Sequence, residues 1–261
     1  MTSNQLPDAL KIIRNRSIEK GAPLHIISDV ELFEATKYKI GLEGAHQRMN
    51  AALAIKVCET WINYKTKQGM KIVKNGTIEG LATTKWPGRC QRYKSEKYLF
   101  DFCLDGAHTV ESLSCCADWI NTVNLNDPKP LILIFNCTHE RQGDILLPPL
   151  ISGITAKIIQ VIFTTNTVSQ TSPGVYSSGG DLLNLNDLDI GVKSQQILAE
   201  KWMRNYGEIR NEDSCSVEVV ATVNDAIEVA ARTLGKDGRI LLTGSLHLVG
   251  AALMVLGAEV E

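Results

Sequence analysis

The pattern of hydrophobic and polar positions changes along the chain at about residue 84. Before that point, residues 6–20 and 45–66 have apolar side chains every three or four positions, which predicts two amphipathic helices. The apolar run at 24–28 predicts a short buried strand between them. In the second helix, Met49, Leu53, Val57 and Trp61 recur every four residues with Ala52 beside them, and this stripe is expected to face the core.

After residue 84, apolar runs and helical patterns alternate. Strands are predicted at 98–104, 131–136, 158–164, 216–221 and 239–243, and helices at 110–123, 144–151, 194–206, 223–234 and 246–256. Pro148-Pro149 is expected to break the second of these helices, and the polar stretch 168–188 to form a loop. Strands that are apolar on both faces and separated by helices predict a mostly parallel sheet covered on both sides. The expected fold class is therefore α/β, with a Rossmann-like domain from about residue 84.

A domain boundary is predicted within residues 65–87. This stretch contains Gly69, Asn75-Gly76 and Gly80, and it ends in the turn signal Trp86-Pro87-Gly88. The sequence therefore predicts two domains, 1–82 and 83–261.

Composition and charge exclude several classes of protein. The formal net charge of -2 over 261 residues argues against a nucleic-acid partner, and no apolar run approaches the roughly 18 residues that a membrane span needs. The seven cysteines form no C-x-x-C pair, so a structural zinc site is not expected, and they indicate a reducing compartment. We expect a cytoplasmic monomer, and the sequence leaves a mitochondrial form open.

Two polar segments follow apolar strands where a parallel sheet usually binds its ligands. They are Asp105-Gly106-Ala107-His108-Thr109 and Thr243-Gly244-Ser245-Leu246-His247. Their small residues allow a ligand to approach the backbone at the start of a helix. An Asp or Ser in this position is also a common helix N-cap, so both interpretations stay open.

The first of these segments, preceded by Trp86-Pro87-Gly88-Arg89-Cys90-Gln91, resembles the folylpolyglutamate synthase branch of the Mur ligase superfamily. Three further segments agree in order and spacing. They are Gly41-Leu42-Glu43-Gly44 leading into residues 46–54, Phe135-Asn136-Cys137-Thr138, and Thr243-Gly244-Ser245-Leu246-His247-Leu248-Val249-Gly250. The resemblance runs from about residue 24 to the end. It implies that 83–261 is the carboxy-terminal ligase domain and that 1–82 is the tail of a truncated P-loop ATPase domain with its linker.

The resemblance also implies a reaction. The family joins the γ-carboxylate of a folate to the amine of L-glutamate, using ATP and Mg²⁺. ATP converts the carboxylate to an acyl phosphate, which the amine then attacks. Small molecules (ATP, tetrahydrofolate and glutamate) are therefore the expected partners.

Three residues match family positions at the nucleotide or at the transferred phosphate. Arg89 matches the arginine that reaches the ATP phosphates, a task suited to a permanently charged guanidinium. Asp105 matches an aspartate that contacts the nucleotide, and the alternative is an N-cap for the helix from Val110. His108 matches the histidine beside the transferred phosphate and the incoming glutamate. Arg89 and His108 are thus the catalytic candidates, each with a purely structural alternative.

Other matches concern the nucleotide and the substrate. Asn50 and His46, with Gln47 beside them, match the helix that faces adenine and ribose, and the alternative is hydrogen bonding between domains. Ser245 matches a position near the substrate, and a structural role is an equal alternative.

One family feature is missing. No G-x-x-x-x-G-K-[ST] loop occurs, and Gly235-Lys236 is followed by Asp237. The Mg²⁺ ligands of the family would lie upstream of residue 1, so no metal ligand is assigned here. The chain is therefore either a ligase without its ATPase half or a non-catalytic derivative that binds nucleotide, folate or a partner. An unrelated nucleotide-binding Rossmann domain is the third alternative, which the ordered motifs disfavour.

Overall fold

The computed structural model describes residues 1–67, 75–137, 143–169, 187–210, 215–235 and 237–258. The chain divides into two compact units, Met1–Lys85 and Trp86–Glu261.

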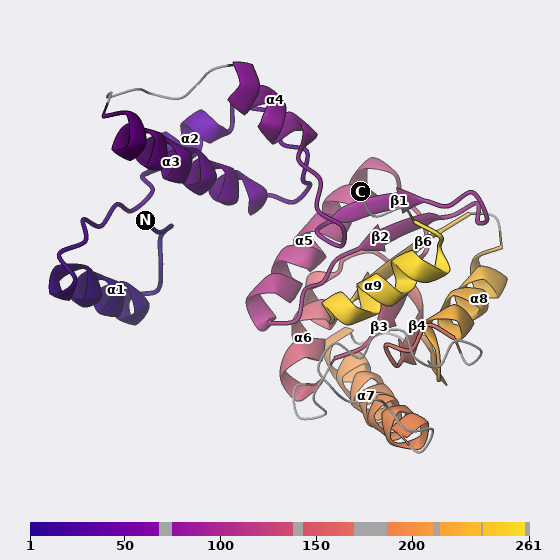
Figure 1. Cartoon of the computed structure of the whole chain (residues 1–261). Helices are drawn as coiled ribbons and strands as arrows, with labels where there is room; N and C mark the ends of the chain where they lie inside the picture. The colour runs from indigo at the N-terminus through magenta and orange to yellow at the C-terminus, as the bar shows by residue number, and fades with distance from the viewer. Residues whose placement is uncertain (68–74, 138–142, 170–186, 211–214, 236, 259–261) are drawn as a thin grey trace. The chain divides into compact units, whose positions relative to one another are not determined.

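The first unit is helical in its described residues. It contains α1 (Pro7–Glu19), α2 (Asp29–Ala35), α3 (Gln47–Thr66) and α4 (Asn75–Thr83) (Figure 1). The two helices predicted before residue 67 are confirmed. The predicted strand at 24–28 is wrong, because Ile26 forms only a single parallel bridge with Thr2. An apolar run becomes a strand only where a neighbouring strand supplies ladder hydrogen bonds, and the described residues of this unit supply one bridge.

The buried face of α3 matches the predicted stripe only in the first half of the helix. Val57 and Trp61 are 48% and 59% exposed, whereas Ala51 and Ala52 are buried. Ala52 packs with Ile27 and Ala35, with Met49 and Leu53 at the margin of this cluster. Small side chains let α2 approach α3 closely, and this outweighs the larger apolar side chains further along the helix.

A set of polar contacts around the Glu31 carboxylate, at the start of α2, stabilises the packing of α2 against α3. Ser28 and Glu31 form a capping box, in which the Ser28 N–H donates to Glu31 Oε2 at 2.9 Å. His25 Nε2 lies 3.0 Å and Lys56 Nζ 3.3 Å from Glu31 Oε1. Burial raises the pKa of Glu31, but the hydrogen bonds from Ser28, His25 and Lys56 outweigh it and lower this pKa to about 2.

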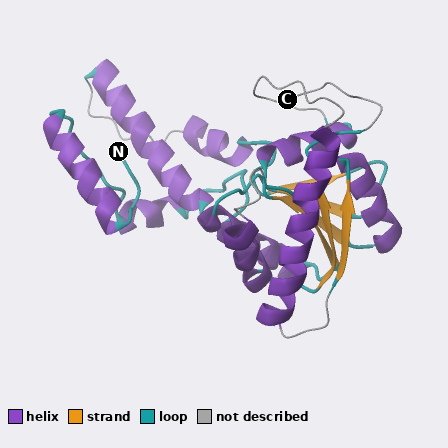
Figure 2. Ribbon diagram, turned by 90° about the horizontal axis from the view of Figure 1, so that it is seen from below, coloured by secondary structure: helices purple, strands orange, loops and turns teal. Residues whose placement is uncertain are grey.

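The second unit is built on a six-stranded sheet with the order β1-β2-β6-β3-β4-β5. The strands are β1 (Gln91–Lys94), β2 (Asp101–Leu104), β3 (Leu131–Phe135), β4 (Ile158–Thr164), β5 (Ser216–Val220) and β6 (Arg239–Thr243) (Figure 2). All neighbouring pairs are parallel except β1 with β2. The predicted mostly parallel sheet is confirmed, and the antiparallel edge strand β1 is an addition to it.

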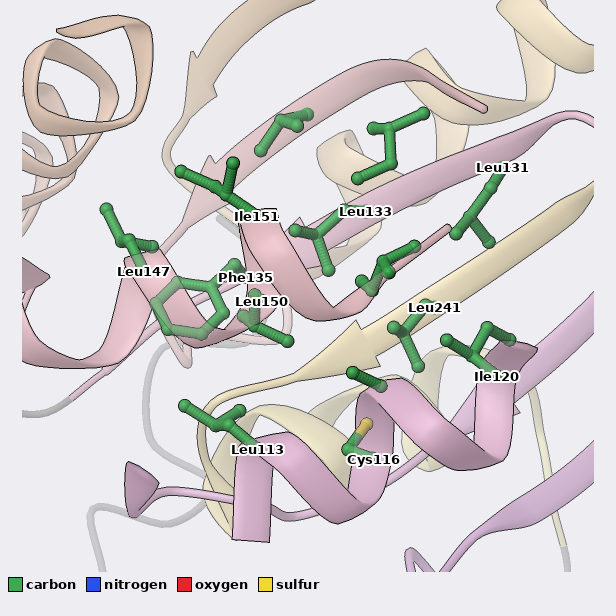
Figure 3. Packing of buried hydrophobic residues seen from close by; sticks show 14 of the residues in the cluster. Leu113, Cys116, Ile120, Leu131, Leu133, Phe135, Leu147, Leu150, Ile151 and Leu241 are labelled. Carbon is green, nitrogen blue, oxygen red and sulfur yellow. The ribbon is translucent and has the colours of Figure 1, made fainter. Parts of the chain in front are cut away.

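Helices cover both faces of this sheet. They are α5 (Val110–Asn126), α6 (Gly143–Gly153), α7 (Asp187–Arg210), α8 (Val223–Leu234) and α9 (Leu246–Val255). Leu133, Phe135 and Leu241 point to the face that α5, α6 and α7 cover (Figure 3). Ile132, Ile134 and Leu242 pack with α8 and α9 on the opposite face. Adjacent strand residues alternate between these two cores, which explains why the strands are continuously apolar. The predicted α/β fold class is confirmed.

Two local predictions for this unit, the helix break at Pro148-Pro149 and the loop at 168–188, are not confirmed. Pro148 and Pro149 lie inside a continuous α6, so the predicted break is wrong. Two N–H donors are lost there, but Leu146, Leu147, Leu150 and Ile151 bury the helix in the core and hold its path. The predicted loop at 168–188 lies largely outside the described residues.

The amino ends of β2 and β6 are held by an ion pair network around the buried Arg239. Arg239, 1% exposed, donates from Nη2 to Asp127 Oδ2 at 3.0 Å and from Nη1 to the Asn124 side chain at 2.9 Å. Lys129 Nζ lies 2.9 Å from Asp101 Oδ2. This network stabilises the end of the sheet opposite to the candidate site.

Candidate functional site

Three neighbouring strands end side by side at the site. Leu104 of β2 pairs with Leu242 of β6, and Phe135 of β3 pairs with Thr243. The backbone N–H of Asp105 then donates to the Leu242 carbonyl at 3.1 Å. The segments 105–109, here called the β2 loop, and 243–247, both singled out in the sequence, therefore start from adjacent strands at the carboxyl edge of the sheet.

Asp105 lies at the start of the β2 loop and is only 6% exposed. Its Oδ2 accepts the Cys90 N–H at 2.7 Å, and its Oδ1 accepts the Ala107 N–H at 2.9 Å. It does not cap α5, so that alternative is wrong. Thr109 is the N-cap, in a capping box with Ser112. The β2 loop continues for four residues after Asp105 before the helix begins, and the carboxylate cannot reach the first turn of α5 as a cap.

The turn at residues 86–90, here called the Arg89 turn, is held by hydrogen bonds on both sides of Arg89. The Gly106 N–H donates to the Gly88 carbonyl at 2.8 Å, and the Gly88 N–H donates to Gln91 Oε1 at 2.8 Å. Gly88 has φ +73°, and a Cβ there would lie 2.7 Å from Val249 Cγ1 of α9. Only glycine therefore allows this turn to lie against α9.

The Arg89 side chain is half-buried, and no hydrogen bond or ion pair with a described residue engages its guanidinium. Its backbone N–H donates to the Trp86 carbonyl at 3.2 Å. A permanently charged group with unused donors is able to bind an anion such as a phosphate.

His108 is exposed near the end of the β2 loop. Its Nδ1 lies 2.9 Å from the Gly106 carbonyl oxygen. A carbonyl only accepts hydrogen bonds, so Nδ1 carries the proton and the lone pair of the neutral ring lies on Nε2. The side chain therefore presents Nε2 to solvent, where it can accept a proton or a hydrogen bond.

Ser245 has a structural role. It is buried, and its Oγ accepts the His247 N–H at 3.1 Å as the N-cap of α9. The expected position at the end of the last strand is correct. The structural alternative therefore has a specific contact in its favour, and the substrate contact stays a prediction.

The nucleotide candidates of the first unit form a chain of hydrogen bonds at the start of α3. Asn50 Nδ2 donates to Gln47 Oε1 at 2.9 Å, and Gln47 Nε2 lies 2.9 Å from His46 Nε2. Gln47 is buried and Asn50 is exposed. This arrangement orients the Asn50 amide, and its binding to a nucleotide stays a prediction.

Two sets of contacts at the site involve motif residues to which the sequence assigned no role. Gln91 supports the Arg89 turn, although it stood out only as part of a motif. Behind the ends of β3 and β4, Asn136 Nδ2 donates to Asn166 Oδ1 at 2.8 Å, and Gln195 Nε2 donates to Asn136 Oδ1. Gln195 lies on α7, 59 residues from Asn136, so only tertiary structure brings these amides together.

Within the described ranges, no three His, Cys, Asp or Glu side chains are grouped so that they could hold a metal ion. None of the helices described is long and apolar enough to cross a membrane.

Two curated relatives resemble the chain along almost its whole length, although it matches no protein-family model. The folylpolyglutamate synthase of Candida albicans is 30% identical over 278 residues, covering 98% of this chain and 52% of that protein. The folylpolyglutamate synthase of Saccharomyces cerevisiae (strain FostersO) is 31% identical over 261 residues, covering 96% of this chain and 45% of that protein. The chain thus spans about half the length of the curated relatives it matches.

Solved structures give the same fold. The Mycobacterium tuberculosis folylpolyglutamate synthase complexed with ADP superposes with a TM-score of 0.66 at 18% identity, covering 99% of this chain and 55% of that one. The folylpolyglutamate synthase of Thermotoga maritima gives a TM-score of 0.56 at 17% identity, covering 98% of this chain and 53% of that one. The half-length coverage fits the carboxy-terminal portion that the motifs indicate.

Proposed function

We propose that this chain, a relative of the folylpolyglutamate synthases that corresponds to their carboxy-terminal portion, serves an ATP-dependent ligase that adds glutamate to the γ-carboxylate of tetrahydrofolate. The observation that carries the proposal is the pair of side chains at the carboxyl edge of the sheet. The guanidinium of Arg89, which no described residue engages, and Nε2 of His108 belong to two segments joined through Asp105.

The proposed chemistry requires charge neutralisation around phosphate. The folate carboxylate attacks the γ-phosphorus of ATP and releases ADP, which gives an acyl phosphate. The glutamate amine then attacks the acyl carbon, and phosphate leaves. Arg89 would bind phosphate oxygens through its N–H donors, and this is stronger in a site shielded from water. His108 Nε2 would accept a proton or a hydrogen bond close to the incoming amine.

The first unit would supply groups for the nucleotide. We assign residues 1–82 to the tail of an ATPase domain and its linker, with Asn50 and His46 toward adenine and ribose. An amide can both donate to and accept from the adenine edge, and Gln47 holds the Asn50 amide in one orientation. Ser245 would act near the substrate mainly by fixing the first turn of α9.

Mg²⁺ belongs to the family reaction, and in the described residues no three His, Cys, Asp or Glu side chains are grouped so that they could hold it. No step is therefore assigned to a metal on this chain. The sequence also lacks a phosphate-binding G-x-x-x-x-G-K-[ST] loop. This absence is consistent with a chain that spans about half the length of its relatives. A non-catalytic derivative that binds nucleotide or folate is the alternative candidate.

ATP binding by residues 1–261 tests the phosphate site that both candidates share. We expect calorimetry to detect weak binding, and Arg89→Gln to lower the affinity at least about tenfold, since a charged hydrogen-bond donor to phosphate is lost. Arg92→Gln is the matched control, because Arg92 is exposed on β1 three residues away. Equal affinities of the Arg89 variant and the parent chain would exclude the assigned role of Arg89.

A further inference from the structure

We propose that Asp105 is a positioning residue, whose carboxylate fastens the Arg89 turn to the β2 loop that carries His108. This rests on the proposed function only for the role of Arg89 toward phosphate. It differs from the role that the family resemblance implies, in which the aspartate contacts the nucleotide directly.

The carboxylate joins two segments that are 15 residues apart in the sequence. Its Oδ2 accepts from Cys90, the residue after Arg89, and its Oδ1 accepts from Ala107, the residue before His108. Each oxygen thus holds the backbone next to one of the two candidate side chains. A single side chain therefore controls the backbone of both.

Burial leaves little room for a direct contact with ribose. Asp105 is 6% exposed, and both of its oxygens already bind backbone N–H groups. Each oxygen keeps a second lone pair, but the burial of Asp105 leaves little surface through which a ribose hydroxyl could reach it. The observed geometry therefore favours a fixed structural link over a ligand contact.

The backbone of the turn needs such a link. Cys90 is a non-glycine residue with φ +44°, in the left-handed region, and it is buried. Side chains other than glycine adopt this conformation at an energetic cost, so it persists only where the surroundings enforce it. The hydrogen bond from the Cys90 N–H to Asp105 acts at this strained residue.

The two residues that flank Arg89 are held independently. Gly88 is held through its carbonyl by Gly106 and through its N–H by Gln91, and Cys90 is held by Asp105. The Arg89 side chain, between them, is unengaged among the described contacts. This arrangement pre-orders the backbone and leaves the guanidinium available.

Amide hydrogen exchange followed by NMR tests the link without any ligand. In the unmodified chain we expect the Cys90 and Ala107 amides to be protected. Asp105→Asn leaves one of them without an acceptor, because the new NH₂ group cannot accept, and its exchange should accelerate at least about tenfold. Asp101→Asn, at the other end of β2, is the matched control and should leave both amides protected. Exchange of both amides at the rate of exposed loops in the unmodified chain would overturn the link, even if Asp105→Asn failed to fold.

Two ligands separate positioning from nucleotide contact. If Asp105 acts through Arg89, Asp105→Asn should weaken the binding of ATP and of inorganic tripolyphosphate by a similar factor. In a chain that already carries Arg89→Gln, adding Asp105→Asn should weaken binding much less. If Asp105 contacts ribose, only ATP binding should weaken, and positioning is refuted. If the unmodified chain binds neither ligand, the proposed phosphate role of Arg89 fails and the exchange result alone decides the link.

Discussion

The turn between β6 and α9 should tolerate no side chain at Gly244. A Cβ at this position would lie 2.2 Å from the Asn136 carbonyl oxygen and 2.6 Å from Cε2 of the Phe135 ring. Gly244 also has φ +102°, which L-residues rarely adopt. Because the nearest atom belongs to the backbone just after β3, a change of rotamer cannot relieve the overlap.

The magnitude follows from two contributions. Forcing a non-glycine residue into this conformation costs about 1–3 kcal/mol. Overpacking a tight site adds about 1–3 kcal/mol. Gly244→Ala should therefore lower the free energy of unfolding of the second unit by about 2–6 kcal/mol, a large part of the stability of a typical domain.

Urea unfolding followed by tryptophan fluorescence measures this change, because Trp119 and Trp202 are buried in the core of the second unit. Gly250→Ala is the matched control. Gly250 lies in α9, and beyond its own helix backbone and chain neighbours nothing lies within 4 Å of the place that an alanine methyl group would occupy. Alanine there should therefore stabilise by about 0.5–1 kcal/mol. A loss below about 1 kcal/mol for Gly244→Ala would refute the packing described for this turn.

Three further predictions concern the whole chain. Residues 1–261 should incorporate little or no labelled glutamate into tetrahydrofolate with ATP and Mg²⁺, because the phosphate contacts of the missing loop act jointly with the other phosphate-binding groups of the site. Clear turnover would contradict this. Limited proteolysis should remove residues 1–66 before the second unit is cut, because their core is small and Phe33, Trp61 and Tyr64 are exposed. Equal resistance of the two parts to the protease would contradict this prediction. Folding lowers the pKa of Glu31, so the ionised carboxylate stabilises the fold fully above its unfolded pKa of 4.5, and this stabilisation is lost as the pH falls toward about 2. Glu31→Gln should therefore abolish this part of the acid unfolding transition measured by circular dichroism.

The order of helices and strands in the second unit was available from the sequence. Five apolar runs and the helical patterns between them predicted β2 to β6 and their helices, because the period of the hydrophobic pattern is a local property. The edge strand β1 was not predicted. Gln91–Lys94 is short and mostly polar, and its pairing with β2 is a non-local contact.

Which face of a helix is buried, and whether a helix continues through prolines, depended on tertiary structure. Val57 and Trp61 fit a buried stripe by spacing, yet α3 packs through Ala52 because α2 approaches it there. Pro148 and Pro149 indicated a helix break, yet burial on α6 outweighs two lost donors. In both cases the energy of packing against another element exceeds the local preference.

The site shows the same division. The sequence by itself determined which segments follow the strands and which side chains could bind phosphate, since residue type and motif order are written in the chain. Only the tertiary structure decided what Asp105 does. Its partners are the backbone amides of Cys90 and Ala107, and a backbone amide has no signature in a sequence until the fold brings it within hydrogen-bonding distance.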